Sequence, residues 1–401
     1  MNRSTERPQR GLSEPHHAIP FARPSIDERE EAAVLRVLRS GWLTTASECQ
    51  AFEREFSAAV GAQHAIAVNS GTAGLHLALE AFGVSRGDRV VTTPYTFTAS
   101  AEVIRYLDAD PLFVDVREDD LNLDPDELHR VLRDDPGITA VIPVHIGGHS
   151  CRMDEITEHC ARAGARVVED AAHAFPGTFA GRPLGTIGEA GVFSFYATKT
   201  LTTGEGGMIV TDDDALARRM SIMRLHGIDR EVWDRYTSSR PSWEYQVVEA
   251  GYKYNMPDIL AAIGRVQLEK SASSTRRRRE IAGAYLSGLT GRDYLRLPNA
   301  SNESSWHLFI IRIDPERLTI DRDEFIRRLA ECGIGTSVHY IPLHVMPYYR
   351  DRYGLRAEDF PVSLKAYQTA ISLPIYPGLH EESVQRVIRE VIRIGDDTLR
   401  R

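Results

Sequence analysis

The chain has 401 residues, 42% of them hydrophobic and 26% charged, which is enough for two packed cores or for one large core with a smaller lid. Its formal net charge is −9 with acids and bases interspersed, which argues against nucleic acid as a principal partner. No apolar run approaches the roughly 18 residues of a membrane-spanning helix, and four scattered cysteines without a C-x-x-C pair indicate a reducing compartment, so we expect a cytoplasmic protein without a membrane partner.

The N-terminal region combines a polar segment with a helix pattern. Residues 1–20 are polar and contain proline and glycine, so we expect a flexible tail. Ser25 and Glu28 then have the spacing of a helix capping box, and Gly41 stands where a helix would end. The apolar residues between them follow at helical spacing: Val34, Leu35 and Leu38. This pattern predicts a helix from about residue 25 to 40.

A series of short apolar runs follows. They lie at 65–69, 89–93, 111–116, 140–145, 166–170, 192–195 and 207–212. Several runs are nearly continuous rather than alternating, and helical patterns separate most of them, as in a sheet that is covered on both faces. The sequence therefore predicts a doubly wound α/β domain.

The pattern changes after about residue 215. A long helical connection begins within 251–270, and the four arginines at 276–279 indicate a solvated helix face or, alternatively, a rim that attracts an anionic substrate. The elements predicted beyond it are strands at 305–314 and 335–343 and helices at 323–334 and 381–394. We expect a tail at 1–20, a large domain at 21–255 and a smaller α+β domain at 256–401.

One acid and one lysine point to a cofactor. Asp170 closes the buried run at 166–170, and Lys199 lies in a turn rich in Ser, Thr and Gly between two strand-like runs. Pyridoxal phosphate needs a lysine that holds its aldehyde as a Schiff base and a carboxylate that keeps its ring nitrogen protonated. The pair therefore favours an enzyme with this cofactor.

Other residues are compatible with the same cofactor, although each has a simpler explanation. Ser70–Thr72 lie between a strand and a helix, where backbone amides can bind a phosphate, but such turns occur in many α/β proteins. Phe97 can stack on a planar ring, although aromatic residues near strand ends are more often core. Ser194 lies on the opposite strand face from two phenylalanines, and His173 follows Asp170 by three residues.

A metal site is a weaker hypothesis. His145, His149 and Cys151 form an H-x-x-x-H-x-C pattern, which is not a standard zinc spacing and has no evident fourth ligand. We expect no metal and interpret this segment as a loop.

Six motifs occur in the order and spacing of a known family. They are NSGTAGLHLAL, GDRVVTTPYTFTAS, VVEDAAHAF, FSFYATKTLTTGEGG, GYKYNMPDILAAIG and GIGTSVHYIPLH. Through them the chain resembles the DegT/DnrJ/EryC1/StrS family of sugar aminotransferases, from about Phe21 to the final helix. The branch that it most resembles aminates C4 of nucleotide-linked 4-keto sugars.

The resemblance implies a fold and a set of cofactor contacts. The fold would be the aspartate-aminotransferase type (fold type I), a large and mostly parallel α/β domain with a smaller C-terminal α+β domain, in a homodimer that shares its active sites. Lys199 corresponds to the Schiff-base lysine, Asp170 to the partner of the pyridine nitrogen and Phe97 to the stacking aromatic. His173 corresponds to the neighbour of the ring hydroxyl. The residues that match the phosphate cradle are Gly71, Thr72 and Ser194.

The chain departs from the family at three places. Many members have Asn and Arg at the variable positions of a G-Y-x-Y-x-M segment that reaches the phosphate of the other subunit, whereas this chain has Lys253 and Asn255, and either can make that contact. Residues 41–47 read GWLTTAS where the family often has G-W-[LI]-T-T-G-P, and Thr200 stands where Asn is common. These departures do not affect the residues of the core chemistry, but they leave the identity of the sugar substrate undetermined.

The implied activity is a transamination that depends on pyridoxal phosphate. An amino group would pass from L-glutamate to a nucleotide-linked 4-keto-6-deoxyhexose on dTDP or UDP, giving a 4-amino sugar and 2-oxoglutarate for antibiotic or polysaccharide biosynthesis. The alternatives are amination at C3, a dehydratase of the aminoshikimate type, and a silent sensor or scaffold. Sugar 3-dehydratases of this family carry histidine in place of the lysine, so Lys199 argues against them. Four residues in C-terminal motifs would approach the sugar or serve as packing positions: His307, His339, Tyr340 and His344.

Overall fold

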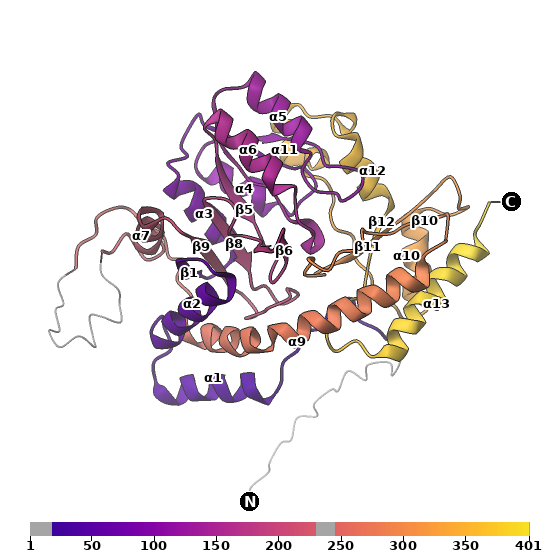
Figure 1. Ribbon diagram of the computed structural model, residues 1–401, viewed down its shortest axis with the longest axis horizontal. Coiled ribbons are helices and arrows are strands. Elements are labelled where there is room, and N and C mark those ends of the chain that lie inside the picture. Colours follow the sequence, from indigo (N-terminus) through magenta and orange to yellow (C-terminus); the bar gives the residue numbers. More distant parts are fainter. Residues whose placement is uncertain (1–17, 230–244, 401) are drawn as a thin grey trace, which may run out of the picture.

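The computed structural model describes residues 18–229 and 245–400, and a seven-stranded sheet forms its centre (Figure 1). In spatial order the strands are β1 (His64–Val68), β9 (Gly207–Thr211), β8 (Ala190–Ser194), β5 (Arg166–Asp170), β4 (Ile138–Val141), β2 (Arg89–Thr92) and β3 (Asp110–Phe113). Only β9 runs antiparallel to its neighbours, β1 and β8, and the other pairs are parallel. The seven predicted strands therefore all exist, and β5 ends at Asp170 as predicted.

Helices cover both faces of this sheet. One face packs against α3 (Gly71–Ala81), α4 (Ala99–Tyr106) and α7 (Asp214–Met223), and the other against α2 (Ser47–Val60), α5 (Pro125–Asp134) and α6 (Met153–Ala163). The strands are buried on both sides, which explains why their sequences are continuous apolar runs. Loops at the carboxyl ends of the parallel strands are thereby left free for a site.

A second, smaller sheet organises the C-terminal part. Its antiparallel strands are β10 (Leu295–Arg296), β11 (Phe309–Ile313) and β12 (Ala370–Leu373). The helices of this part are α10 (Arg322–Glu331), α11 (Pro347–Tyr353), α12 (Pro361–Thr369) and α13 (Glu381–Asp397). Short elements complete the chain: β6 (Thr178–Phe179), β7 (Arg182–Pro183), η1 (Ile146–Gly148), η2 (Leu343–Val345) and η3 (Ala357–Asp359).

The predicted strand at 335–343 is wrong. This segment is irregular, and its backbone pairs with the small sheet through Ser337, whose amide and carbonyl bond to the backbone of Ser372. β11 pairs instead with β12, and Phe309 of β11 lies opposite Leu373 of β12. Residues 338–343 are therefore free to leave the sheet and approach the large domain, where Tyr95 Oη donates to the His339 carbonyl at 2.5 Å.

The helix α9 (Asp258–Leu289) runs along both domains (Figure 1). The helix begins at Asp258, after the first residues of the predicted 251–270 segment. The interpretation of its arginines as a solvated face is wrong for Arg278, which is buried. Its Nη1 donates to three carbonyl oxygens, the shortest bond being 2.8 Å to Ile375. Arg278 thus joins the middle of α9 to the start of β11 and the end of β12.

The first helix, α1 (Glu28–Ser40), packs on α9 through small residues. Asp27 and Glu30 form its capping box, two residues later than Ser25 and Glu28, and Gly41 ends it as predicted, with a φ of 75°. Ala33 and Val37 face α9, whereas Leu35 and Leu38 are 46% and 47% exposed. The predicted apolar stripe therefore faces away from the core.

Two further sequence predictions concern the ends and the membrane. Residues 1–17 of the predicted tail lie outside the described residues, and within the remainder Ile19 is buried and pairs with Ile334. Among the helices of residues 18–229 and 245–400, none is long and apolar enough to cross a bilayer.

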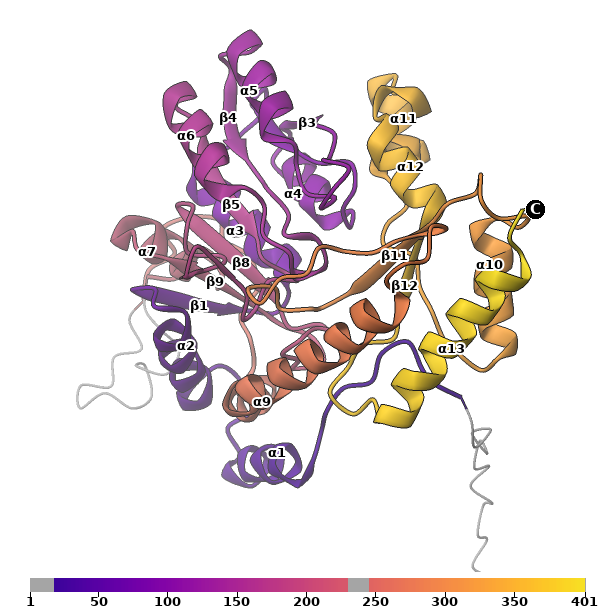
Figure 2. The same cartoon turned by 45° about the vertical axis from the view of Figure 1, so that its right-hand side comes forward.

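Figure 2 shows the segment between β10 and β11 reaching from the small sheet to the large domain, where the Thr178 amide donates to the Glu303 carbonyl at 2.9 Å.

Candidate active site

Lys199 lies in the turn that follows β8. Its amide donates to the Tyr196 carbonyl at 2.9 Å, and the neighbouring Thr200 hydroxyl donates to the Phe175 carbonyl at 2.5 Å, which anchors the turn to the large domain. Burial lowers the pKa of Lys199 to about 8, against the opposing attraction of the Asp170 carboxylate. A substantial neutral fraction near pH 8 makes this amine able to act as a nucleophile and as a base.

Asp170 is held at the carboxyl end of β5. Its side chain is buried, Oδ2 accepts from Ser100 Oγ at 2.7 Å, and Oδ1 accepts from the Ala172 amide at 3.1 Å. Burial raises the pKa of Asp170, while the bonds from Ser100 and Ala172 act in the opposite direction. A cation beside this carboxyl would favour its charged form. Ser100 was not predicted, although it lies only three residues after Phe97 in the same motif.

His173 is fixed as a neutral ring by its neighbours. Its Nδ1 accepts from the Gly147 amide at 3.2 Å, and its Nε2 lies 3.0 Å from Tyr340 Oη. Burial holds the pKa of His173 well below its usual value, with Lys199 adding to the effect. An Nδ1 that accepts implies that the proton is on Nε2, so His173 donates to Tyr340.

Two more of the predicted C-terminal residues join this cluster. The His307 ring centre is 4.4 Å from that of His173, and its buried Nδ1 has no hydrogen-bond partner among the described residues. His339 Nδ1 bonds to Ser372 Oγ at 2.8 Å, and burial lowers the pKa of His339 to about 4. His339 and His307 are therefore neutral at pH 7, and they surround the space near Lys199.

His344 lies elsewhere. It is fully buried, its Nε2 bonds to the Ala357 carbonyl at 3.2 Å, and its ring packs 4.9 Å from Phe360. These contacts connect η2 with η3, and none of them involves the other predicted site residues. The structure gives His344 a packing position.

The residues predicted to bind a phosphate lie together at the start of α3. Ser70 caps this helix by accepting from the Ala73 amide at 3.1 Å, and the first amides of a helix have no intrahelical acceptor. A Cβ on Gly71 would lie 3.1 Å from Ser194 Cβ, so the end of β8 adjoins this helix terminus. Thr72 follows in the first turn of α3. The arrangement offers amides and a hydroxyl to an anion.

Phe97 and the 252–256 segment complete the predicted set. Phe97 is 58% exposed, and its ring centre is 6.1 Å from that of Tyr340. Lys253 is exposed, and its Nζ donates to Asn255 Oδ1 at 2.7 Å, while Asn255 Nδ2 donates to Thr45 Oγ1 at 2.6 Å. An exposed aromatic ring beside a buried carboxyl provides a face for a flat ligand.

A buried acid and histidine support the site from behind, and their pairing was not predicted. Glu169 and His145 are both fully buried, with Glu169 Oε2 2.9 Å from His145 Nε2. His145 Nδ1 accepts from the Cys151 amide at 3.2 Å, so its proton is on Nε2. The pattern that resembled a metal site is therefore a hydrogen-bonded support for the loop that carries Gly147.

These side chains fit pyridoxal phosphate. The buried carboxyl of Asp170 can accept one more donor, as a protonated ring nitrogen would supply, and the helix terminus at Gly71 suits a phosphate. Lys199 suits the aldehyde because its amine is partly neutral near pH 8. The exposed ring of Phe97 suits the flat face of the cofactor.

Comparisons with known proteins agree with this chemistry. The profile of the DegT/DnrJ/EryC1/StrS aminotransferase family matches residues 24–392. The spore coat polysaccharide biosynthesis protein SpsC of Bacillus subtilis is 44% identical over 387 residues, which cover 95% of this chain and 99% of SpsC.

Solved structures are similar over the same length. The PLP-form of Spr1654, described as a putative sugar aminotransferase from Streptococcus pneumoniae, is 31% identical with a TM-score of 0.88, covering 96% of this chain and 100% of that one. Helicobacter pylori PseC, an aminotransferase involved in the biosynthesis of pseudoaminic acid, is 26% identical with a TM-score of 0.88, covering 95% and 100%.

Proposed function

Because the chain belongs to the DegT/DnrJ/EryC1/StrS aminotransferase family, we propose that it aminates C4 of a nucleotide-linked 4-keto-6-deoxyhexose with L-glutamate as the amino donor. The coarser statement is established: the chain is a sugar aminotransferase of this family, it depends on pyridoxal phosphate, and it has the type I fold. The observation that carries the proposal is the meeting of Asp170 and Lys199 at the carboxyl ends of β5 and β8.

Each residue of the site has a distinct task in this proposal. When bound, pyridoxal phosphate supplies an aldehyde for the amino group and a ring that withdraws electrons from the adjacent carbon. Lys199 Nζ would hold the cofactor at rest and, once released, would serve as the base that accepts and returns a substrate proton. Asp170 Oδ2, positioned by Ser100, receives the ring N–H and keeps it protonated.

The surrounding side chains orient and shield the reacting groups. Phe97 would stack on the cofactor ring, the amides of Gly71 and Thr72 with the Ser194 hydroxyl would bind the phosphate, and His173 would lie on the side of the ring hydroxyl. The neutral histidines at 307 and 339 with Tyr340 would line the sugar side. Neutral imidazoles suit a polyhydroxylated substrate because they donate and accept hydrogen bonds without adding charge.

We also propose a homodimer with shared active sites. Its support is a set of exposed apolar side chains, each 45–49% exposed: Ile26, Leu35, Leu38 and Leu43. Ile26 and Leu35 line one hollow together with Ala197 of the Lys199 turn. A monomer would leave these side chains in water.

Within this dimer we assign the contact with the partner subunit's phosphate to Lys253. Asn255 Nδ2 already donates to Thr45 Oγ1, whereas Lys253 Nζ is exposed and, among the described residues, uses only one of its donors, on Asn255 Oδ1.

The decisive experiment offers purified, cofactor-loaded protein L-glutamate and a panel of dTDP- and UDP-linked keto sugars. We expect a 4-amino sugar, identified by mass and NMR, and 2-oxoglutarate in equal amount. Lys199→Ala should give neither, which controls for background chemistry. Product from a 3-keto sugar alone would replace C4 by C3 amination, and loss of water without nitrogen transfer would indicate the dehydratase. A colourless protein that takes up no cofactor would indicate a sensor or scaffold.

The quaternary proposal has its own test. Light scattering should give twice the chain mass, and mixed dimers of Lys199→Ala with Lys253→Ala should recover one intact site when the two chains are refolded together. Recovery requires that each site draw Lys199 and Lys253 from different chains. Mixed dimers as inactive as both parents would overturn the assignment of Lys253.

A further inference from the structure

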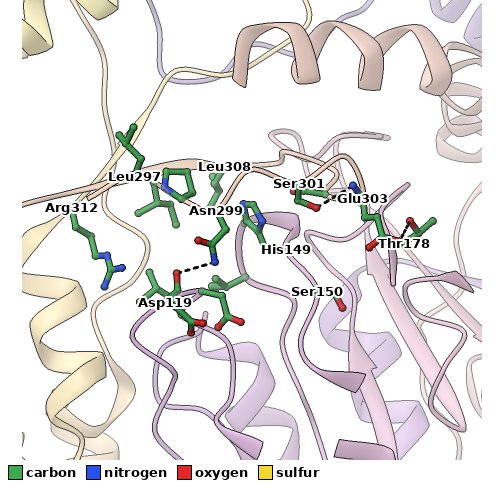
Figure 3. A pocket seen from close by; sticks show the side chains of 17 residues that line it. Asp119, His149, Ser150, Thr178, Leu297, Asn299, Ser301, Glu303, Leu308 and Arg312 are labelled. Carbon is green, nitrogen blue, oxygen red and sulfur yellow. Dashed lines mark hydrogen bonds between the residues drawn. The ribbon is translucent and has the colours of Figure 1, made fainter. Parts of the chain in front are cut away.

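A second cavity lies between the two domains, behind the loop that supports His173 (Figure 3). Its volume is about 180 Å³. Its lining comes from residues within 119–121, 146–150 and 297–304, the last being the strap between β10 and β11, from 308–312 in and beside β11, and from Thr178. Gly147 belongs to this lining, and its amide holds His173 Nδ1. The cavity and the active site therefore share a wall.

Opposite charges line this cavity without neutralising each other. Arg312 is only 9% exposed, and the hydrogen bond that it makes among the described residues is from Nη2 to the Glu118 carbonyl, at 2.7 Å. No ion pair joins it to a carboxylate in that part of the chain. Burial lowers the pKa of Arg312 to about 10, although Asp119 attracts it. The guanidinium thus keeps unused donors toward the cavity.

One of the two acids of the same cavity is also incompletely satisfied, whereas Asp120 Oδ1 accepts from the Asn122 amide at 2.9 Å. Asp119 Oδ1 is shut off from solvent without a hydrogen-bond partner, while its Oδ2 bonds to Arg117 at 2.6 Å. Asp120 is 3.8 Å from Arg117 Nε, and burial raises the pKa of Asp120 to about 6. A donor that entered the cavity would therefore stabilise both carboxyl groups.

An imidazole completes the polar lining. His149 Nε2 is buried and has no partner in the described part of the chain, and burial lowers the pKa of His149 to about 4. In the view of Figure 3, Asp119 and Asn299 lie between Arg312 and His149. The walls between these polar groups are apolar: Leu121, Ile146, Leu297, Leu308 and Ile310.

We propose that this interdomain cavity binds a small dipolar ligand, an α-amino acid, with its carboxylate toward Arg312 and its ammonium toward Asp119 and Asp120. A purely anionic ligand would leave the unpartnered Asp119 Oδ1 without a donor, and a purely cationic ligand would leave Arg312 without a counter-charge. The cavity suits a whole amino acid of about the size of valine, since a cavity of roughly 150 Å³ admits benzene. This site is separate from the aminotransfer and does not depend on it.

The test compares three ligands on the cofactor-loaded protein. L-valine carries both charges, isobutylamine lacks the carboxylate and isobutyrate lacks the ammonium. Calorimetric titration should show saturable binding of L-valine, and each single-charge analogue should bind at least about tenfold more weakly. Absence of saturable L-valine binding up to tens of millimolar, or equal binding of either analogue, would overturn the proposal.

Matched variants locate the binding. Arg312→Gln and Asp120→Asn should each weaken L-valine binding at least about tenfold. Arg296 lies directly opposite Arg312 on β10 and does not line the cavity, so Arg296→Gln is the control and should stay within about twofold. Trp306 packs 4.8 Å from His149 and reports occupancy through its fluorescence. If Arg312→Gln binds as well as the control, L-valine occupies another place and the proposal is wrong.

Discussion

The Glu169→Gln substitution should weaken the support behind the active site. Glu169 is fully buried, and its two oxygens accept four hydrogen bonds. Oε1 accepts from the amides of Ile187 and Gly188 at 2.6 and 2.7 Å, and Oε2 accepts from the Gly185 amide and His145 Nε2 at 2.8 and 2.9 Å. The carboxylate therefore joins the turn at 185–188 to the loop that carries Gly147.

Glutamine cannot reproduce this pattern. Its carbonyl oxygen can serve Ile187 and Gly188, but its NH₂ group then faces two other donors, the Gly185 amide and the Nε2–H of His145. An orphaned buried donor costs about 1–3 kcal/mol, and the bonds that remain, from Ile187 and Gly188, lose their charge assistance. Relief from burying a charge offsets part of this loss. We expect the free energy of unfolding to fall by about 2–4 kcal/mol, or about 2–5 °C in Tm for a chain of this length.

The assay is thermal and urea unfolding of the variant beside wild type, with Glu189→Gln as the matched control. Glu189 lies at the end of the same turn and is exposed, and its carboxylate accepts one hydrogen bond, from the Val167 amide at 2.7 Å. The control should change stability by less than about 0.5 kcal/mol. A Glu169→Gln protein as stable as Glu189→Gln would refute the reasoning.

The same pair of proteins gives a pH test with a definite sign. Burial alone would raise the pKa of Glu169, but hydrogen bonds from His145 and from the backbone amides lower it below its ordinary value of 4.5. A lowered folded-state pKa adds stability above the unfolded value, and that stability is lost as the pH falls through the folded value. The stability difference between wild type and Glu169→Gln should therefore be constant at neutral pH and shrink below about pH 4.5.

Three further predictions concern the site and its scaffold. In cofactor-free protein, Lys199 should react half-maximally with an amine-selective reagent near pH 8, because burial lowers its pKa to about 8; a midpoint near 10.5 would show an ordinary lysine. Ser100→Ala should weaken cofactor binding about tenfold or more, measured by absorbance titration, because a bond to the Asp170 carboxylate is lost. Gly283→Ala should stabilise α9 by about 0.5–1 kcal/mol in urea unfolding, since this glycine is exposed and a Cβ there meets nothing within 4 Å; destabilisation would show a missed contact.

The features that the sequence predicts correctly are those that depend on neighbouring residues along the chain. The apolar runs predict the strands because burial on both faces leaves a continuous pattern, and Asp170 and Lys199 stand out because one cofactor needs both residue types. The capping box was misplaced by two residues because Ser25 and Asp27 are both good caps with a Glu three positions later. Helix ends are decided by small differences of this kind.

Contacts between distant segments could not be predicted in this way. The pairing of β11 with β12 joins residues about 60 positions apart, and the apolar 335–343 segment has the same local appearance as a strand. The burial of Arg278 depends on carbonyl groups of two later segments. Glu169 similarly finds its donors in a turn and a loop that no local pattern connects to it.

The continuous helix α9 has a consequence for how the protein unfolds. It contains 32 residues and so is about 48 Å long. Its first turns pack with α1 and α2, whereas its later residues Ile281, Ala282, Tyr285 and Leu289 belong to the core of the small domain. Loss of either core would strip one half of this helix of its packing and weaken the other half. Two hydrophobic cores should therefore melt together, in a single calorimetric transition.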